Sequence, residues 1–436
     1  MLKKIILNPV RKQFNDLDKL PLYDRSLVDY SKYNNSIGHA GVKYSMAVQA
    51  TRGCPYRCFY CDVYKTTLHH YRRSVDSIYE EVKMIADMGV KRIEFIDDIF
   101  NVKAKDFVGF FNRVIKDNLN VSFFFPTALK GDLLNKEIID VMMQGGAVGV
   151  NVSLESASPR MQKVMRKNLN IEKFRENLEY ICSKYPEAVT TLNTMHGFPT
   201  ETEDEAMMTL NFIQSMKWIH FPYTHIVRIF PGTDLEQFAL NHGMPKKVIN
   251  ESIDKSYHEV TPTLPFSKEF TNKYKLTFLK DYVLNKERLS KVLPVQMKHF
   301  TEDEINQRYS SYFPGKVNGV RDVLKMAGLK ESSFNIKFLD EKEIVIKDPY
   351  NQSGLSEVDT QKISQIQNEL DEKLKMVYAN LDPWQTTMVA RHEDRPKSKF
   401  FIDNLFEDFI PLSGDRFYGE DLSVLCGFAK FNGLSV

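Results

Sequence analysis

The chain has 436 residues, which suits roughly two to three domains, and its hydrophobic and charged contents of 42% and 27% are ordinary for a folded protein in water. Its net charge of +2 gives no reason to expect a nucleic-acid partner or an anionic membrane surface. No apolar run approaches the ~20 residues of a membrane-spanning helix. The opening stretch from Met1 to Val10 is too short and too interrupted for a signal peptide.

Residues 1–45 carry few strong patterns, and we interpret them as a linker-like segment. A short apolar run at residues 46–50 then predicts the first strand. It leads directly into a loop that holds Cys54, Cys58 and Cys61, three of the five cysteines in the chain.

Thiolates gathered this closely usually ligate metal, because their negative charges repel one another until a cation holds them. A zinc site normally takes four protein ligands, often from two CxxC pairs, and the sequence has no second pair. Three thiolates on one loop suit three irons of a four-iron cluster and leave the fourth iron open. We therefore predict a 4Fe–4S cluster, with a disulfide or a chance grouping as the alternatives. Reduced thiols also favour a cytoplasmic location.

Short apolar runs alternate with segments of helical periodicity after the cysteine loop. The first such segment, residues 74–88, repeats apolar residues at three- and four-residue steps between a possible N-cap, Ser74, and a possible stop, Gly89. About six strand–helix units of this kind predict parallel strands joined by right-handed crossovers. We expect a partial (β/α)6 TIM-like barrel, whose working face lies where the strands end. The remaining strands are expected at 90–96, 121–125, 147–154, 188–195 and 224–230, and the remaining helices at 136–143, 171–184 and 203–216.

The pattern changes after the barrel. Helices are expected at 268–289, 302–312 and 320–327, so the fold class becomes an α/β barrel core with a helical C-terminal extension. The domain boundaries that we expect are a linker at 1–45, a core at 46–244, the helical extension at 245–334, a junction at 335–357 and a small α/β tail at 358–436.

The tail has an apolar helical stripe from Ile363 to Val377, interpreted as a core-facing or coiled-coil surface. A helix at 398–409 and a strand at 422–431 follow, and Asn432-Gly433 predicts a hairpin turn. Because few residues remain for the return strand, we expect the tail to be an incomplete domain; a short edge strand is the alternative.

The motifs that follow the strands carry a resemblance to a known family. The chain resembles the radical S-adenosylmethionine (radical SAM) superfamily, and in particular the branch that often has an N-terminal cobalamin-binding domain. The resemblance covers roughly residues 15–260. It rests on the cysteine loop with Arg52-Gly53 and Tyr60, then on Phe95-Ile96-Asp97-Asp98, Ser153-Leu154-Glu155-Ser156, Gly197-Phe198-Pro199-Thr200-Glu201-Thr202 and Phe230-Pro231-Gly232-Thr233.

The resemblance implies an enzyme that reductively cleaves S-adenosylmethionine (SAM) at a 4Fe–4S cluster to give a 5′-deoxyadenosyl radical, which abstracts hydrogen from a substrate. The cluster ligands would be Cys54, Cys58 and Cys61. The substrate would be a small or lipid-like molecule, and the reaction a methyl transfer, a cyclisation or an oxidation. A flavodoxin or ferredoxin would be the electron donor.

SAM-binding roles are implied for several residues, each with a structural alternative. Tyr60 would lie against the adenine, or else pack within the loop. Asp97 or Asp98 would accept from the methionine ammonium, with a helix N-cap as the alternative. Glu155 would bind the ribose hydroxyls or the methionine amine, or form a surface ion pair. The further candidates are Gly197 and Gly232 for backbone approach, Arg166 or Lys167 for the carboxylate, and His196, His225 and Arg228 as weaker substrate contacts.

Residues 1–45 contain no cobalamin-binding pattern, so cobalamin is expected only in trans, if it takes part at all; a truncated start is the remaining explanation. The tail, in contrast, resembles the N-terminal part of the acetyl-CoA carboxylase carboxyltransferase α subunit, through Leu381-Asp382-Pro383-Trp384-Gln385, Ala390-Arg391-His392 and Gly414-Asp415-Arg416. The alternative function is therefore a carboxyltransferase-like protein whose catalytic half is missing or in trans. Its partner would be a carboxyltransferase or a cobalamin protein.

Overall fold

The computed structural model describes residues 14–25, 45–67, 69–253, 265–313, 317–334 and 337–340, with pieces of the C-terminal part at 372–373, 375–376, 379–383, 407–412, 426–431 and 434–435. The chain forms two compact units, Met1–Ser353 and Gly354–Val436. Each unit is described by itself.

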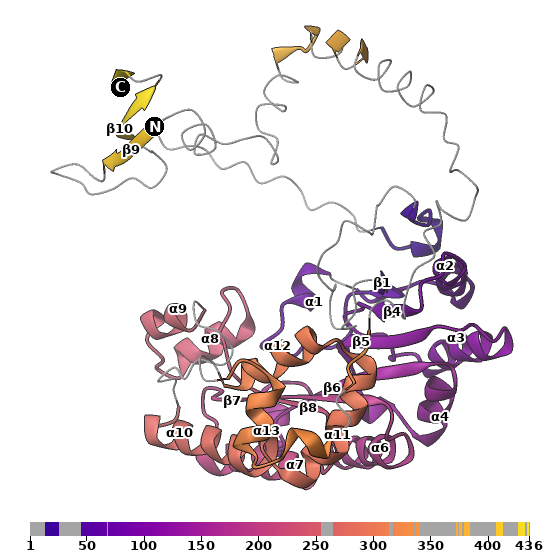
Figure 1. Ribbon diagram of the computed structural model, residues 1–436, viewed down its shortest axis with the longest axis vertical. Helices are drawn as coiled ribbons and strands as arrows, with labels where there is room; N and C mark the ends of the chain where they lie inside the picture. The colour runs from indigo at the N-terminus through magenta and orange to yellow at the C-terminus, as the bar shows by residue number, and fades with distance from the viewer. Residues whose placement is uncertain are drawn as a thin grey trace. The chain divides into compact units, whose positions relative to one another are not determined.

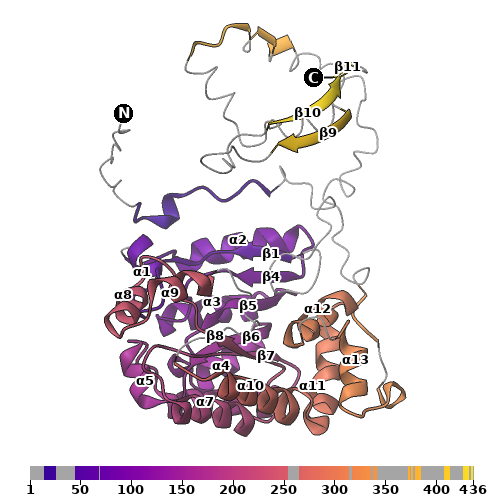
Figure 2. The same cartoon turned by 90° about the vertical axis from the view of Figure 1, so that its left-hand side faces the viewer.

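The first unit is built on a six-stranded sheet in which every neighbouring pair of strands is parallel. Strand order follows chain order, so each connection advances by one strand, and β1 and β8 form the two edges (Figure 2). This arrangement confirms the predicted partial TIM-like barrel. The strands are β1 (Ser45–Val48), β4 (Arg92–Phe95), β5 (Ser122–Leu129), β6 (Ala147–Glu155), β7 (Val189–His196) and β8 (Phe221–Ile226).

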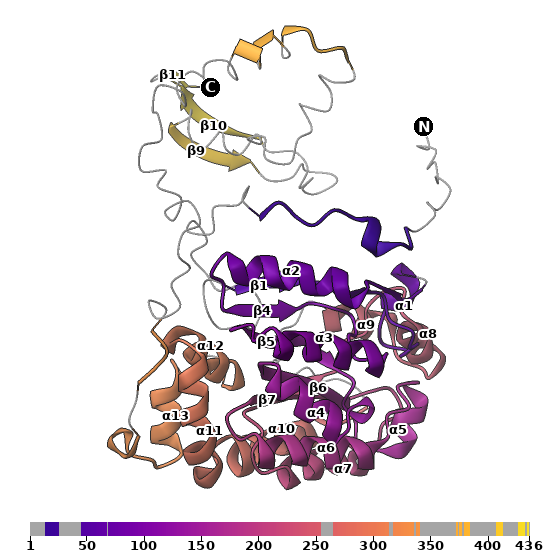
Figure 3. The same cartoon turned by 90° about the vertical axis from the view of Figure 1, so that its right-hand side faces the viewer.

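Helices cover the outer face of this sheet (Figure 3). They are α2 (Val75–Asp87), α3 (Ala104–Lys116), α4 (Lys136–Gln144), α6 (Ile171–Lys184) and α7 (Glu203–Ser215). In α2 the Ser74 side chain accepts from the backbone N–H of Ser77, which caps the first turn as expected. The apolar face of α2 is buried, with Ile78, Val82 and Ile85 fully covered.

Helix α3 was not among the elements predicted from the sequence. Its buried face consists of Phe107, Phe110, Phe111 and Val114, which recur at helical spacing. The ring centroids of Phe107 and Phe110 lie 4.9 and 6.1 Å from that of Phe100. The three rings belong to an aromatic cluster that packs against the first strands of the sheet. The apolar spacing in residues 107–114 was therefore a sufficient signal for this helix.

Two strands depart from their predicted bounds because of proline. Pro126 does not end β5, which continues to Leu129 through an irregular register against β6. β8 is Phe221–Ile226 rather than residues 224–230, and Pro222 is accommodated because β8 is an edge strand. Proline has no backbone N–H to donate. It is tolerated at both positions because neither residue is hydrogen-bonded along its backbone to neighbouring strands on both sides.

The helical extension is more divided than predicted. The single helix expected at 268–289 is wrong: α10 ends at Thr277, a π-helical turn spans Phe278–Val283, and Asn285 caps the next helix by accepting from the N–H of Arg288. The helices of this region are α8 (Asp234–Asn241), α9 (Lys246–Ile253), α10 (Lys268–Thr277), α11 (Lys286–His299), α12 (Glu302–Tyr312) and α13 (Val320–Met326). The predictions for α12 and α13 agree with the structure.

The two ends of the sheet carry different elements, as Figures 1 and 2 show. Helix α8 lies with α1 (Val63–Thr66) and α5 (Pro159–Val164) where the strands end, and α11, α12 and α13 lie where the strands begin. No helix among the described residues is long and apolar enough to cross a membrane.

The described part of the second unit is a three-stranded antiparallel sheet of order β11-β10-β9. The strands are β9 (Glu407–Leu412), β10 (Cys426–Phe431) and β11 (Leu434–Ser435). Phe431 pairs with Leu434, which confirms the hairpin. Residues 407–409 are strand, so the helix predicted at 398–409 is wrong at its end. The five apolar residues of the Ile363-to-Val377 stripe, the Asn432-Gly433 turn itself and the 26–44 part of the linker lie outside the described residues.

Candidate active site

The cysteine loop leaves the sheet after β1 and is bounded by a small antiparallel ribbon of β2 (Thr51–Arg52) and β3 (Tyr71–Arg72). Gly53 begins the loop with a φ of +81°, a conformation that side-chain-bearing residues rarely adopt. A Cβ at this position would lie 2.3 Å from the carbonyl oxygen of His69. A side chain at this position would therefore strain the backbone and displace the His69 carbonyl.

Asp97 and Asp98 hold the backbone that precedes the loop. Oδ1 of the buried Asp97 accepts from the hydroxyl of Thr51 at 2.6 Å and from its N–H, while Oδ2 accepts from the N–H of Ala50 at 3.3 Å. Burial raises the pKa of Asp97 to about 6 against these hydrogen bonds. The exposed Asp98 accepts from the N–H of Gly53 at 2.9 Å. Both carboxylates thus fix the backbone at the start of the loop. Only one oxygen of Asp98 takes part in the contact with Gly53.

The middle of the loop is fixed to two other strand-end connections. The N–H of Phe59 donates to the carbonyl of Met165 at 3.0 Å, and its carbonyl accepts from the N–H of Leu235 at 2.8 Å. The Phe59 ring stacks on Phe198, with the two centroids 5.8 Å apart. The loop therefore has a defined backbone path across the mouth of the barrel.

An exposed ion-pair network reinforces that path. Asp234 at the start of α8 bonds Lys65 of α1 at 2.9 Å and Arg166, which follows α5, at 2.7 Å. Hydrogen bonding from Lys65 is the main reason that the pKa of Asp234 falls to about 2. One carboxylate thus joins the segment after the cysteines to the turns after β6 and β8.

The thiols of Cys54, Cys58 and Cys61 are free and half-buried. Burial raises the pKa of each, that of Cys54 to about 11, and neighbouring cysteine charges raise the pKa of Cys54 and Cys61 further. Such a group needs cations to become thiolate. In the described residues no set of three such side chains is already positioned for a single metal ion. Three cysteine thiols on one loop are a donor set that iron of a 4Fe–4S cluster accepts, with one iron left without a protein ligand.

Tyr60, Glu155 and Lys167 meet beside these thiols. Nζ of Lys167 lies 2.9 Å from Oε1 of Glu155, and the Tyr60 hydroxyl is 3.5 Å from the same oxygen. The hydroxyl also reaches the thiol of Cys58, and burial raises the pKa of Tyr60 well above its usual value. Glu155 ends β6 with a φ of +66°, a strained conformation of the kind found at ligand sites.

The two predicted glycines have different surroundings. Gly197, at φ +89°, donates its N–H to Oε2 of the buried Glu201 at 2.6 Å, as Phe198 does at 3.1 Å. Gly232, at φ +81°, is exposed, and a Cβ there would meet nothing within 4 Å. Lys65 donates to its carbonyl. Sequence reasoning did not single out Glu201, although it stands within the motif that contains Gly197.

A cavity of about 800 Å³ lies inside the barrel, below Tyr60 and Glu155. It extends along β5 to β8 as far as α12, whose residues Glu304, Gln307, Arg308 and Ser311 line its far end. Its walls are Tyr60, Phe124, Phe125, Pro126, Gly149, Val150, Asn151, Ser153, Glu155, Val189, Thr191, Asn193, Met195, Tyr223, His225, Phe300, Glu304, Gln307, Arg308 and Ser311.

Polar residues inside this cavity were missed by sequence reasoning. Asn151 and Ser153 alternate along β6, and Thr191 and Asn193 alternate along β7, so one face of each strand presents uncharged polar groups. Nδ2 of Asn193 donates to Oδ1 of Asn151 at 2.7 Å. In β6 this period-two polar pattern within an otherwise apolar strand was an available signal, whereas β7 also has Thr190 and Thr194 on its other face.

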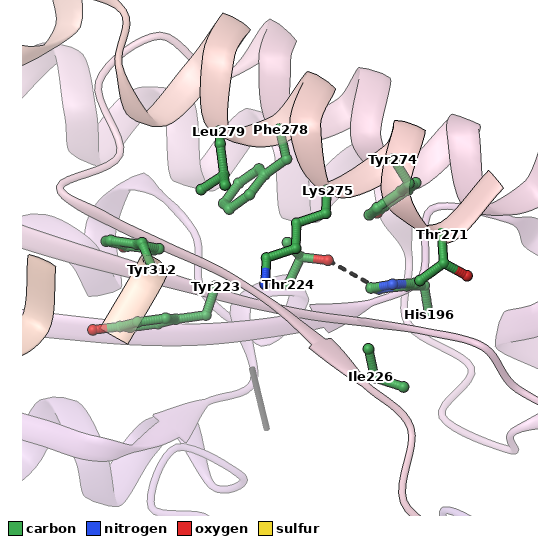
Figure 4. Close-up of a pocket in the computed structure, with 10 residues that line it drawn as sticks. All are labelled: His196, Tyr223, Thr224, Ile226, Thr271, Tyr274, Lys275, Phe278, Leu279 and Tyr312. Carbon is green, nitrogen blue, oxygen red and sulfur yellow. Dashed lines mark hydrogen bonds between the residues drawn. The ribbon is translucent and has the colours of Figure 1, made fainter. Parts of the chain in front are cut away.

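Of the three weaker substrate candidates, only His225 lines this cavity. His196 projects from the outer face of the sheet, where it lines a pocket of about 40 Å³ against α10 (Figure 4). Its Nδ1 is 3.0 Å from the hydroxyl of Thr224, its ring stacks on Tyr274 at 4.3 Å, and burial lowers its pKa to about 3. Arg228 donates to the carbonyl of Ile253 at 3.1 Å. His196 and Arg228 thus have structural partners, which was the alternative to a substrate contact for these weak candidates.

Comparison with known proteins finds two separate family matches along the chain. Residues 48–213 match the model of the Radical SAM superfamily, and residues 332–436 match that of acetyl co-enzyme A carboxylase carboxyltransferase-like proteins. The α subunit of acetyl-coenzyme A carboxylase carboxyl transferase from Pelagibacter ubique is 72% identical over 102 residues, 23% of this chain and 28% of that protein. An uncharacterized methyltransferase from Pyrococcus horikoshii is 26% identical over 247 residues, 55% of this chain and 51% of that protein.

The chain thus spans about a quarter of the first relative and about half of the second. Among solved structures, the radical S-adenosylmethionine methyltransferase TsrM from Kitasatospora setae, with cobalamin and a 4Fe-4S cluster bound, is 17% identical with a TM-score of 0.41 over 45% of this chain and 41% of that one. The cobalamin-dependent S-adenosylmethionine radical enzyme OxsB, with aqua-cobalamin and S-adenosylmethionine bound, is 14% identical with a TM-score of 0.37 over 76% of this chain and 56% of that one. From the family matches, the chain contains a radical SAM domain at residues 48–213 and an acetyl-CoA carboxylase carboxyltransferase α-like region at residues 332–436.

Proposed function

We propose that this protein is a radical SAM enzyme that acts on a small molecule held inside the barrel. The observation that carries the proposal is the position of the cysteine loop at the end of the sheet: its own residue Tyr60, which lies between Cys58 and Cys61, lines the cavity of about 800 Å³. The loop and the cavity are thus joined through one side chain.

Cys54, Cys58 and Cys61 would hold a 4Fe–4S cluster, whose chemistry is to supply the electron that breaks a carbon–sulfur bond of SAM. The task of the protein is to orient SAM and to exclude water. Asp97 and Asp98 keep the loop in place through Thr51 and Gly53.

Residues at the mouth have the chemistry that SAM requires. Glu155 can accept from the ribose hydroxyls or the methionine amine, and Lys167 beside it can neutralise the methionine carboxylate. Tyr60 and the peptide of Gly197 offer an aromatic edge and a close backbone approach to the adenine. Asp98, with one oxygen free of the Gly53 contact, is a second acceptor for the methionine ammonium.

The reaction class that we favour is methyl transfer, ahead of cyclisation or oxidation, because a relative over half of the chain is named a methyltransferase. A flavodoxin or ferredoxin would deliver the electron, cobalamin would come only from a separate protein, and the location would be cytoplasmic. The thiol-rich loop suits a reducing compartment.

The experiment is anaerobic reconstitution followed by reduction in the presence of SAM, with 5′-deoxyadenosine measured by chromatography. We expect the wild-type chain to form it and Cys58→Ala to form none. Cys182→Ala is the matched control, since Cys182 is a buried residue of α6 whose thiol lies 3.9 Å from the hydroxyl of Thr190 at the start of β7. Equal, background amounts from wild type and Cys58→Ala would reject the enzymatic proposal.

A second candidate function concerns residues 332–436, because 72% identity to a carboxyltransferase α subunit is high for a region without a shared role. We propose that this region contacts carboxyltransferase subunits. Size-exclusion chromatography of the full chain with a purified carboxyltransferase β subunit should give a joint peak. Separate elution of the two at micromolar concentration would remove this candidate.

A further inference from the structure

The middle of the barrel cavity contains two amide side chains whose orientation is fixed by their neighbours. Nδ2 of Asn151 donates to the carbonyl of Pro126 at 2.7 Å, and Oδ1 of Asn151 accepts from Nδ2 of Asn193 at 2.7 Å. The same Nδ2 of Asn193 lies 3.4 Å from the hydroxyl of Ser153. These contacts settle which atom of each amide is oxygen and which is nitrogen.

The pair therefore offers a ligand one acceptor and one donor. Both N–H groups of Asn193 have protein acceptors, and among the described residues none donates to its Oδ1. Asn151 has a second N–H besides the one used by Pro126. A group that donates to Asn193 and accepts from Asn151 would complete both amides.

The charged residues of the cavity are already neutralised by one another. At the mouth Glu155 is paired with Lys167, and at the α12 end Arg308 bonds Glu304 through two nitrogens, at 2.7 and 2.8 Å. The Arg308 guanidinium also lies 4.8 Å from the ring centroids of both Phe221 and Phe300, and its side chain is 8% exposed. Releasing it for a substrate anion would break two charge-assisted hydrogen bonds and two ring contacts.

Flat aromatic rings line the space around the amide pair. Phe124 comes from β5, and Tyr223 stacks on His225 at 5.7 Å with an angle of 17° between the rings. Gly149 lets the Phe124 ring lie flat against β6, because a Cβ there would lie 2.2 Å from that ring. An uncharged, flat ligand fits such walls, whereas a charged one would lose its hydration without a partner.

We propose that the cavity selects substrates whose enclosed part is uncharged and carries an amide-like group, with a donor and an acceptor side by side, that pairs with Asn193 and Asn151. The inference rests on the proposed function for the identity of the cavity as a substrate site. Asn193 and Asn151 are then specificity-determining residues.

The test uses three probes of nearly equal shape: benzamide, which is neutral, benzoate, which is an anion, and benzamidine, which is a cation. Ligand-observed NMR with the reconstituted protein and SAM at pH 8, above the ordinary histidine pKa of about 6.5, gives their relative affinities. We expect benzamide to bind about tenfold more tightly than either charged probe. Benzoate cannot donate to Asn193 and benzamidine cannot accept from Asn151.

Asn193→Asp conserves the size of the side chain and replaces the neutral acceptor by an anion. We expect it to weaken benzamide and to make benzamidine the preferred probe. Asn120→Asp, which adds the same charge at an exposed position after α3, should leave the preference of the wild type unchanged.

Equal or tighter binding of benzoate or benzamidine to the wild type, or binding of none of the three, would overturn the inference. A preference for benzamide that Asn193→Asp does not alter would also overturn it. Because binding of the probes requires no SAM cleavage, these results are independent of 5′-deoxyadenosine formation. A protein that cleaves SAM but shows no preference refutes the inference alone.

Discussion

Nζ of Lys167 lies 2.9 Å from Oε1 of Glu155, and both side chains are about nine-tenths covered at the mouth of the barrel. Glu155 holds this position with a φ of +66°, which costs backbone energy, and the register of β6 against β7 shifts at the same residue. The turn that strains Glu155 is the one that points its carboxylate at Tyr60 and the cavity.

Removing one member of this pair should cost more than removing both. Lys167→Met leaves a covered carboxylate without its cation, and we expect a loss of about 1–3 kcal/mol in the free energy of unfolding. The double variant Glu155→Gln/Lys167→Met should recover part of this loss. Denaturant unfolding of the wild type, the two single variants and the double variant measures the coupling; strictly additive losses would show that the pair does not interact.

Gly53 and Gly232 form a natural comparison, because both have a φ of +81° but only Gly53 faces a close neighbour. Gly232→Ala should cost only the left-handed conformation, about 1–2 kcal/mol. Gly53→Ala must also displace the carbonyl of His69, so we expect it to cost about 1–3 kcal/mol more and to lower cluster occupancy. Thermal unfolding and iron analysis of the two variants check this order, and equal effects would contradict the close contact.

The fold was predictable where apolar periodicity is local. The 74–88 helix has its spacing, its cap and its stop within one short segment, and α2 matches it. The division of residues 268–289 was not predictable in the same way, because the apolar pattern passes through the π-helical turn without interruption. There, the Asn285 cap and packing against the barrel decide where one helix ends.

The candidate site follows the same rule: its contiguous motifs were predictable, and its contacts between strands were not. The cysteines and the strand-end motifs were visible in sequence because each is a contiguous pattern. The pairing of Asn151 with Asn193 was not, since it depends on the register of β6 against β7, which tertiary packing sets. Likewise the direction of His196 follows from strand alternation: Met195 lines the cavity, so His196 points to the outer face.

The buried Glu201 should make the stability of the folded protein depend on pH. Burial raises its pKa from 4.5 to about 8, and among the described residues hydrogen bonds reach only its Oε2, from the N–H groups of Gly197 and Phe198. A carboxyl with a raised pKa stabilises the fold fully below its unfolded pKa and loses that contribution as the pH rises through the folded one. Glu201→Gln keeps an oxygen acceptor and cannot ionise, so it should gain in melting temperature relative to wild type between pH 5 and about 9.

Melting curves of wild type and Glu201→Gln across that range check the prediction. Glu187→Gln, at an exposed carboxylate, serves as the control and should follow the wild-type profile. Parallel curves for wild type and Glu201→Gln would show that Glu201 is ionised throughout.

The central claim is that Cys54, Cys58 and Cys61 hold a 4Fe–4S cluster with one iron open to SAM. The most direct measurement is the iron and sulfide content of the anaerobically reconstituted protein, combined with the EPR spectrum of the reduced form before and after SAM is added. We predict a 4Fe–4S stoichiometry and a SAM-dependent change in the spectrum for wild type and Cys182→Ala, and neither for Cys58→Ala. Equal iron in Cys58→Ala and wild type, or a wild-type spectrum that SAM leaves unchanged, would contradict the account.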